Sequence, residues 1–236
     1  MSGQGEFMKR ISNHELLKNF IAKHDIENIF DKDFISHMEL HFYEKGECVF
    51  KAESDLEYYY LLVDGKIRVS YPFENGKAMF LKFYKAFNTI GDLELLKDRS
   101  IICDIETMED TYLIAISSGI IRKSYRDDPK FLRYLVDSLS DKLYATINNS
   151  SYNFVYPLIN RFSSYLVEHI TDQSKVVFHS SFVEIAQFLG TTYRHLNRTI
   201  KELEKKSVIK CEDKMIRIID EDKLRELSKN PYVKSL

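Results

Sequence analysis

The 236-residue sequence predicts an α+β protein in which an N-terminal β jelly roll is followed by a long helix and a C-terminal helical domain. Three observations support this order. Residues 38–118 form short apolar or alternating runs between turns, residues 129–147 carry an apolar stripe of helical period, and residues 181–206 hold two amphipathic segments joined by a glycine. Because 44% of the chain is hydrophobic and 13% aromatic, it can bury a proper core.

Charge and cysteine content bound the class of protein. Residues 175–236 contain 13 Lys and Arg against 9 Asp and Glu, a net charge of +4, which leaves −6 for the remainder because the whole chain carries −2. The three cysteines, Cys48, Cys103 and Cys211, are odd in number and scattered, as expected in a reducing cytosol. With no signal peptide and no run of about 18 apolar residues, we expect a soluble cytoplasmic protein without membrane contact.

The N-terminal domain is predicted to open with a short helix and continue as strands. Ser12 and Glu15 have the spacing of a capping box ahead of a helical apolar stripe. Residues 58–63 read as an apolar strand, and Asp64-Gly65 and Asn75-Gly76 are typical hairpin turns. Many short strands with turns at this spacing predict a sandwich or jelly roll.

A long helix is predicted to start at Asp127-Asp128-Pro129, because carboxylates favour the cap and proline the first turn. Its apolar seam has the three- and four-residue spacing of a two-stranded coiled coil, which indicates a homodimer; the alternative is a helix that packs only on its own domain. Asn148 to Ser151 interrupt the stripe, and a new helical run begins at Val155. The predicted seam residues are Leu132, Leu135, Leu139, Leu143 and Ile147.

The C-terminal domain contains the pattern of a helix-turn-helix. Ser181 and Glu184 form a second capping box, Gly190 is placed to end the first helix, and Thr191 or Thr192 caps the next. The second helix has apolar positions at three- and four-residue spacing and leaves its N-terminal polar residues open, as a helix that enters the DNA major groove does. A hairpin over residues 208–219 would form a wing. The alternative is an ordinary helical hairpin with a solvated basic face.

The polar residues of the second helix have the chemistry of DNA contacts. Arg194 and Arg198 are four residues apart, hence on one face, and the arginine fork can pair with guanine O6 and N7. Lysines after them would attract phosphate without regard to sequence. The predicted base-reading residues are Tyr193, Arg194 and Arg198, and the predicted phosphate contacts are Ser181, Thr191, Thr192, His195, Asn197 and Lys201.

The order of jelly roll, long helix and winged helix-turn-helix resembles the CRP/FNR family of bacterial transcription regulators over about residues 30–227. The motifs that carry this resemblance are residues 45–50 (KGECVF), 60–69 (YLLVDGKIRV), 90–93 (IGDL) and 184–190 (EIAQFLG), with Arg198 and Leu203-Glu204. Residues 90–95 (IGDLEL), 157–161 (PLINR) and 193–196 (YRHL) are most similar to the YeiL-type regulators.

The resemblance implies an architecture and a function. The domains would be an effector-sensing, cyclic-nucleotide-binding-like jelly roll at 1–126, a dimerisation helix at 127–153 and a winged helix-turn-helix at 154–236. A homodimer would bind an inverted-repeat operator in double-stranded DNA and act with RNA polymerase. Family members usually carry an acidic residue where this chain has Arg194, which points to a different operator.

The same resemblance implies an effector site in the jelly roll. Members that bind cyclic AMP have Gly-Glu-Leu followed by a loop and an Arg-Ser pair, and this chain has Gly91-Asp92-Leu93 and then Arg99-Ser100. The carboxylate and the loop are both shorter here, so we expect another small effector or a partner rather than a cyclic nucleotide; the alternative is a domain that binds no effector at all. An FNR-type iron-sulfur cluster, which needs four cysteines, is not expected from three.

The rival function is a jelly-roll metalloenzyme of the cupin type with a helical appendage. His37, Glu39 and His41 are the nearest approach to a metal site, but the next histidine is His169, so the ligand count fails and surface histidines are the better interpretation. We find no nucleophile motif and no phosphate loop, and predict neither a metal site nor an enzyme. The cysteines are expected to be buried or idle, with a Cys48/Cys103 redox pair as the alternative.

Overall fold

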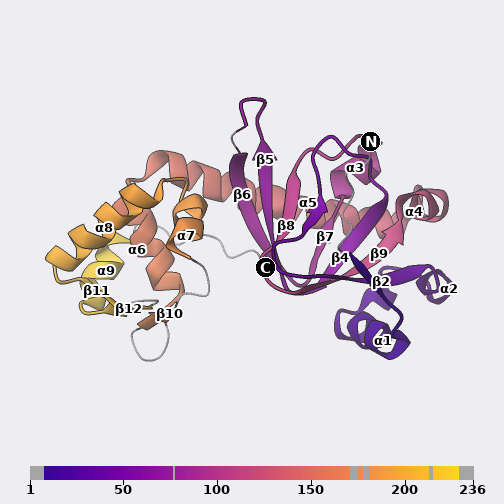
Figure 1. Ribbon diagram of the computed structural model, residues 1–236, viewed down its shortest axis with the longest axis horizontal. Helices are drawn as coiled ribbons and strands as arrows, with labels where there is room; N and C mark the ends of the chain where they lie inside the picture. Colours follow the sequence, from indigo (N-terminus) through magenta and orange to yellow (C-terminus); the bar gives the residue numbers. More distant parts are fainter. Residues whose placement is uncertain (1–7, 77, 171–174, 178–180, 213–214, 229–236) are drawn as a thin grey trace. The chain divides into compact units, whose positions relative to one another are not determined.

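The computed structural model describes residues 8–76, 78–170, 175–177, 181–212 and 215–228. It divides into two compact units, Met1–Leu139 and Ser140–Leu236. The division lies inside a long helix rather than at either end of it. Each unit has its own apolar core, and Figure 1 shows the elements of each.

The first unit contains two antiparallel sheets, which confirms the jelly-roll prediction. The larger sheet has the strand order β1 (Lys9–Ile11), β2 (Met38–Tyr43), β9 (Thr111–Ser117), β4 (Tyr58–Asp64) and β7 (Asn88–Ile90). The smaller has the order β3 (Cys48–Phe50), β8 (Asp104–Thr107), β5 (Lys66–Pro72) and β6 (Ala78–Lys85). The apolar run of β4 is buried on both faces, since Tyr59, Leu61 and Leu62 are all 0% exposed.

The two predicted hairpin turns occupy the expected places. Asp64 ends β4 and Lys66 begins β5, with Gly65 between them at φ 99°. A Cβ at Gly65 would lie 2.5 Å from the Thr111 hydroxyl oxygen, so no other residue fits without displacing β9. Residues 73–76 join β5 to β6, whose register pairs Pro72 with Ala78.

Short helices pack around the larger sheet of the first unit (Figure 1). They are α1 (His14–Lys23), the 3-10 helix η1 (Ile26–Asn28), α2 (Lys32–Ile35), α3 (Asp92–Lys97) and α4 (Ser118–Tyr125). The cap of α1 is Asn13, whose side chain accepts from the Leu16 N–H at 3.0 Å, so the predicted Ser12 cap is one residue early. Strand β1 and helices α3 and α4 lack a strong local signal and were not predicted.

The long helix α5 (Pro129–Val155) begins where predicted. The Asp128 carboxylate accepts from the Phe131 N–H at 2.7 Å, and Pro129 lies in the first turn, where it needs no hydrogen-bond partner. The predicted interruption at residues 148–151 is wrong, because the backbone stays helical through them. Asparagine and serine lower helix propensity without abolishing it, and four further residues continue the helix to Val155.

The second unit contains four helices and a small antiparallel sheet within its described residues. The helices are α6 (Leu158–Glu168), α7 (Phe182–Phe188), α8 (Tyr193–Lys205) and α9 (Glu221–Leu227). The sheet has the order β10 (Lys175–Val177), β12 (Met215–Ile218) and β11 (Ile209–Glu212). Pro157 is the N-cap of α6. Leucine and isoleucine side chains from α6, α7, α8 and the sheet form one core.

Candidate nucleic-acid interface

The turn between α7 and α8 is built by the residues predicted from its sequence. Ser181 accepts from the Glu184 N–H at 3.3 Å, while the Glu184 carboxylate accepts from the Ser181 N–H at 2.7 Å, a complete capping box. Gly190 follows α7 at φ 62°, a left-handed conformation that glycine adopts without strain. The Thr191 N–H then bonds the Ala186 carbonyl at 2.9 Å, which closes the helix end.

Thr192 is the cap of α8, the candidate recognition helix. Its side-chain oxygen accepts from the His195 N–H at 3.2 Å, and the Thr191 hydroxyl contacts the His195 ring at 3.2 Å. Thr191 therefore fixes the His195 side chain, while Thr192 fixes the backbone. Both threonines and His195 lie at the surface beside the helix N-terminus, where backbone N–H groups favour an anion.

The two faces of α8 differ completely in character. Leu196, Ile200 and Leu203 are at most 4% exposed and belong to the core of the second unit. Tyr193 is 50% exposed, and Arg194 and Arg198 are also exposed. A helix with this division presents its N-terminal polar residues to a partner while its apolar face holds it in place.

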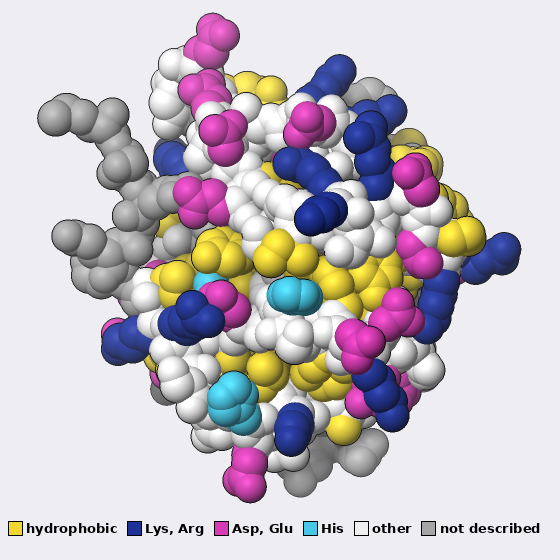
Figure 2. Space-filling view, turned by 90° about the vertical axis from the view of Figure 1, so that its right-hand side faces the viewer, with side chains coloured by type: hydrophobic (Ala, Val, Ile, Leu, Met, Phe, Trp, Pro, Cys, Tyr) yellow, Lys and Arg dark blue, Asp and Glu magenta, His cyan; other side chains and the backbone are white. Residues whose placement is uncertain are grey.

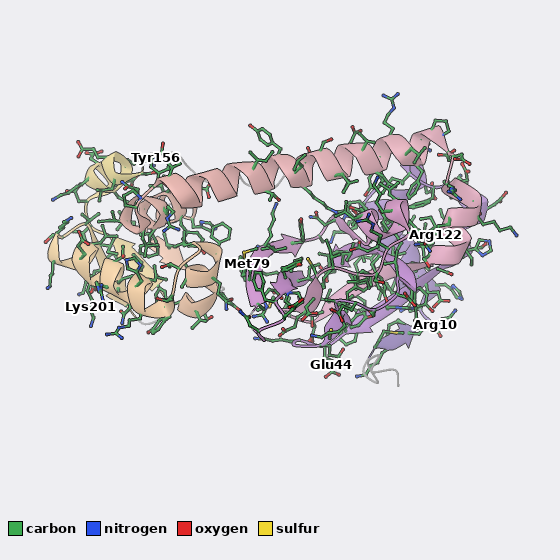
Figure 3. All side chains as sticks on the ribbon, turned by 90° about the horizontal axis from the view of Figure 1, so that it is seen from above. Arg10, Glu44, Met79, Arg122, Tyr156 and Lys201 are labelled. Carbon is green, nitrogen blue, oxygen red and sulfur yellow. The ribbon has the colours of Figure 1, made fainter. Side chains whose placement is uncertain are left out.

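The cations on the open face of α8 are available to a partner. Within the described part of the chain, Arg194, Arg198 and Lys201 make no ion pair, and Lys201 points outward in Figure 3. Lys206, one turn further along, is held by Glu202 at 2.6 Å. The two unpaired arginines thus lie in the first two turns of the helix, and Lys201 lies in its third turn. Asn197 is half-buried beside them.

A buried arginine contacts the C-terminal end of α7, next to the turn. Arg161 of α6 is 9% exposed, and its guanidinium donates to the Leu189 carbonyl at the end of α7. This carbonyl is one of those that a helix leaves without a partner inside the helix. Local sequence gives no signal for this contact, because Arg161 and Leu189 are 28 residues apart.

The predicted wing is a two-stranded hairpin of β11 and β12 that pairs Ile209 with Ile218 and Glu212 with Met215. Its turn residues 213–214 lie outside the described residues. Lys210 lies 3.7 Å from Glu212, and the Cys211 N–H donates to Glu204 of α8 at 2.9 Å. The hairpin is therefore tied to the recognition helix.

Comparison with known families agrees with both units. Residues 40–128 match the model of the cyclic nucleotide-binding domain, and residues 160–227 match the model of the Crp-like helix-turn-helix domain. The chain belongs to the CRP/FNR family. It is therefore a transcription regulator with a helix-turn-helix DNA-binding domain, as the sequence predicted.

Relatives of this CRP/FNR protein include two curated regulators. The regulatory protein YeiL of Escherichia coli O157:H7 is 27% identical over 156 residues, which cover 66% of this chain and 69% of the relative. The cAMP-activated global transcriptional regulator CRP of Haemophilus influenzae is 24% identical over 191 residues, 78% of this chain and 85% of the relative.

Solved structures of the CRP/FNR fold superpose on most of the chain. A transcriptional regulator of the Crp/Fnr family from Eubacterium rectale gives a TM-score of 0.72 at 18% identity and covers 90% of this chain and 100% of its own. A CooA mutant from Carboxydothermus hydrogenoformans gives 0.68 at 18% identity, covering 87% and 94% respectively. At these identities the likeness concerns the fold.

The five predicted effector residues differ in exposure. Gly91, at φ 96°, precedes α3, and Asp92 is only 3% exposed. Leu93 is 49% exposed, and Arg99 and Ser100 are exposed beyond the end of α3. The arginine-serine pair is thus separated from the buried carboxylate by the helix. Their role as an effector site stays a prediction.

A buried polar cluster lies instead between β7 and α5. The Thr89 hydroxyl donates to the Asp92 carboxylate at 2.9 Å and contacts the Ser138 hydroxyl of α5 at 3.1 Å. Burial raises the pKa of Tyr59, which lies near Asp92, and it raises the pKa of Tyr84 to about 12. Only Asp92 of this cluster was singled out in the sequence, since its other members come from separate elements.

The prediction that Leu135 belongs to the dimer seam is wrong. Leu135 is 1% exposed and packs in the core of the first unit together with Phe131, so it cannot contact a second chain. Val136 is 59% exposed in its place. The apolar side chains on the open face of α5 are Leu132, Val136, Leu139, Leu143 and Ile147, of which Leu132 and Leu139 are half-buried.

Of His37 and His41, both predicted to lie at the surface, only His37 does so. His41 is 0% exposed, and its ring nitrogens contact the Tyr60 hydroxyl at 3.2 Å and the Glu39 carboxylate at 3.1 Å. Burial lowers the pKa of His41, and the hydrogen bond with Glu39 opposes that shift. His37 is exposed and packs edge-on against Phe34. Among the described residues, no three or more His, Cys, Asp or Glu side chains gather as metal ligands.

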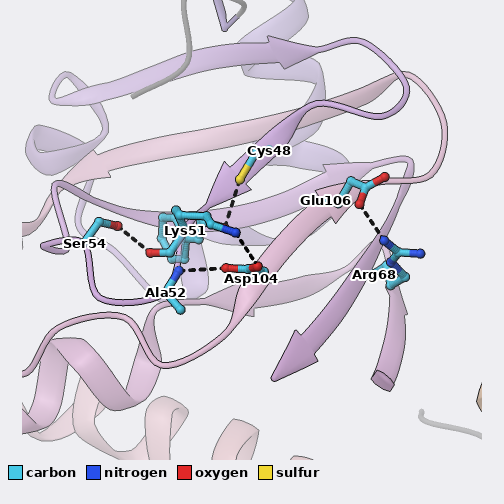
Figure 4. A network of polar contacts seen from close by, with 8 residues as sticks. Cys48, Lys51, Ala52, Ser54, Arg68, Asp104 and Glu106 are labelled. Carbon is cyan, nitrogen blue, oxygen red and sulfur yellow. Dashed lines mark hydrogen bonds and ion pairs between the residues drawn. The ribbon is translucent and has the colours of Figure 1, made fainter. Parts of the chain in front are cut away.

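The thiols are free, and two carry raised pKa values. Burial raises the pKa of Cys103 to about 11 and also raises that of Cys48, whose sulfur contacts the Phe50 carbonyl at 3.2 Å. Figure 4 shows Cys48 beside the ion pair of Lys51 and Asp104, which are 2.6 Å apart. Cys48 is exposed as a residue, although its thiol is partly buried, and Cys103 and Cys211 are half-buried. No helix in the described ranges is long and apolar enough to span a bilayer.

Proposed function

We propose that this CRP/FNR regulator is a homodimer that binds an inverted-repeat operator and reads it with Tyr193, Arg194 and Arg198. The observation that carries this proposal is the open face of α8, where an exposed tyrosine and two unpaired arginines lie within the first two turns of a helix whose other face is buried. Arginine forks recognise guanine edges in the major groove, and a tyrosine can contact bases or phosphates.

Phosphate contacts would surround this reading face. Ser181, Thr191 and Thr192 lie at the N-terminal ends of α7 and α8, where hydroxyl and backbone N–H groups can donate hydrogen bonds to phosphate oxygens. His195, Asn197 and Lys201 extend the same surface along α8. Such contacts fix the register of the protein on DNA without selecting sequence.

The open face of α5 supports a second chain as the partner. Leu132 and Leu139 are seven residues apart, as are Val136 and Leu143, which is the heptad period of a two-stranded coiled coil. A stripe of exposed leucine, valine and isoleucine on one long helix is costly in water. A symmetric dimer would bury the stripe and present two recognition helices to half-sites about 34–36 Å apart.

An effector and RNA polymerase would complete the mechanism. The N-terminal unit of such a regulator would bind a small molecule or a partner, and that ligand can alter DNA affinity only if it binds the two states of the protein with different affinity. Contacts with RNA polymerase would then change transcription. No catalytic role is proposed for any residue.

The experiment begins with selection of bound genomic fragments, followed by fluorescence anisotropy on the selected operator. Arg194→Ala and Arg198→Ala should each cost about 1–3 kcal/mol of binding free energy and relax base choice at one position. Arg225→Ala removes an equal charge from α9, where Arg225 pairs with Glu221 at 2.6 Å, and serves as the control. Equal losses on operator and random DNA would exclude the base-reading role.

A further inference from the structure

A cavity of about 230 Å³ lies within the first unit, among α3, α4 and the start of α5. Its inner wall is apolar, with Ile121, Phe131 and Leu135 at most 2% exposed and Leu95 at 8%. These side chains belong to the core, so the inner wall is fixed by packing rather than by a mobile loop. Figure 2, which views the end of this unit, shows apolar side chains in a band between charged ones.

The mouth of the cavity is charged. Arg122 and Arg126, four residues apart along α4, contribute two guanidinium groups, and Asp98 and Asp127 contribute two carboxylates. Leu96, which is 43% exposed, completes the rim. An apolar interior with a few convergent polar groups is the usual composition of a small-molecule site.

One N–H group of Arg122 has no hydrogen-bond acceptor among the described residues. One terminal nitrogen donates to the Glu94 carbonyl at 3.2 Å and lies 3.1 Å from the Asp98 carboxylate, so the side chain points from α4 toward α3 (Figure 3). Its Nε is buried and has no hydrogen-bond partner among the described residues. A buried N–H without an acceptor is costly, about 1–3 kcal/mol.

We propose that this cavity binds a small organic anion, with its carboxylate on Arg122 and Arg126 and its apolar body against the inner wall. The Arg122 side chain is 32% exposed, so part of it can be reached by a ligand, whereas the Asp98 side chain is 86% exposed and Asp127 is exposed, so water solvates both carboxylates. The Arg122–Asp98 ion pair is therefore weak and exchangeable.

The size of the cavity limits the ligand. An apolar cavity of about 150 Å³ accommodates benzene, so 230 Å³ accommodates one six-membered ring, or a chain of similar volume, with a carboxymethyl group. Cyclic nucleotides are too large. The site is also distinct from the predicted effector residues around Gly91 and Arg99, since none of them lines it.

Titration calorimetry on the full chain, without DNA, tests the proposal independently of the DNA-binding function. The probes are phenylacetate and hexanoate, with phenylacetamide as the neutral analogue. We expect saturable binding of one or both anions at one site per chain, and binding of phenylacetamide at least tenfold weaker than that of phenylacetate. Absence of binding by both anions, or equal binding of the amide, would overturn the proposal.

Variants locate the site. Arg122→Met should weaken anion binding about 10- to 100-fold, since hydrogen bonds to charged groups are lost. Lys123→Met removes the same charge from the adjacent exposed position of α4, outside the cavity, and should leave binding unchanged. Leu96→Trp should block the mouth without changing charge. Equal effects of the Arg122 and Lys123 variants, or full binding by Leu96→Trp with a normal melting curve, would refute this location.

Discussion

Leu143→Glu tests the pairing of the long helices most directly. Leu143 is 60% exposed in the single chain and lies at the middle of the open apolar face of α5. Burying a whole leucine side chain stabilises by about 1.5–3 kcal/mol. Covering its exposed three-fifths on both chains of a symmetric dimer is therefore worth about 2–4 kcal/mol in total.

Loss of that burial should weaken dimerisation about 30- to 700-fold, because each 1.4 kcal/mol is a factor of about ten. The substitution also places two carboxylates opposite each other, which adds repulsion. Since Leu143 contributes little to the core of either unit, the melting temperature of the separated chain should change little. Sedimentation equilibrium over a concentration series measures the dissociation constant.

Tyr144→Glu provides the matched control. Tyr144 is 63% exposed, about as accessible as Leu143, but it lies about 100° further around the helix and off the seam. This variant should dimerise almost normally. If Leu143→Glu left the dissociation constant unchanged, or if the two variants weakened the dimer equally, the chains would pair through another face.

Three further results are expected. Ser181→Ala should lower the free energy of unfolding by about 0.5–2 kcal/mol in a urea titration, because the capping box is lost; an unchanged midpoint would contradict this. Burial lowers the pKa of His41 in the folded chain below its ordinary value of 6.5. The neutral, buried histidine therefore contributes its full stabilisation of the folded state above about pH 6.5. As the pH falls below that value, the unfolded chain binds the proton first, and the free energy of unfolding decreases. In the His41→Gln variant, the free energy of unfolding should therefore decrease less between pH 6.5 and 5 than it does in the original chain. The same decrease in both proteins would show that His41 is not the group responsible. Raising the pKa of Cys103 from 9 to about 11 reduces its thiolate about a hundredfold at pH 7.5, so iodoacetamide should alkylate it far more slowly than a free thiol does. A rate equal to that of free cysteine would be inconsistent with this environment.

Local sequence predicts the helix-turn-helix well because its determinants are neighbours in the chain. Ser181 and Glu184 cap α7, Gly190 takes the left-handed turn, and Thr192 caps α8, each through contacts within five residues. The hairpin at Gly65 is local in the same way. These patterns need no knowledge of the rest of the fold.

Features that depend on distant segments were not predictable from pattern. Leu135 and Val136 are adjacent apolar residues of α5, and only packing against the larger sheet decides that the first is buried and the second open. The sequence around His41 predicts a surface histidine, because its partner Tyr60 lies on another strand. Only the fold brings the Tyr60 hydroxyl to the His41 ring. Arg161 reaches the end of α7 across 28 positions of sequence.

The support of α8 is separate from its reading face. Gly190, Thr192 and Arg161 set the position of the helix, whereas Tyr193, Arg194 and Arg198 contribute almost nothing to the core. Substitutions at exposed positions typically change stability by less than about 0.5 kcal/mol. If Tyr193, Arg194 and Arg198 read bases as proposed, single substitutions there would change the operator preference and leave folding intact, so that closely similar chains would serve different sets of genes and new specificities could be selected from a library at these three positions.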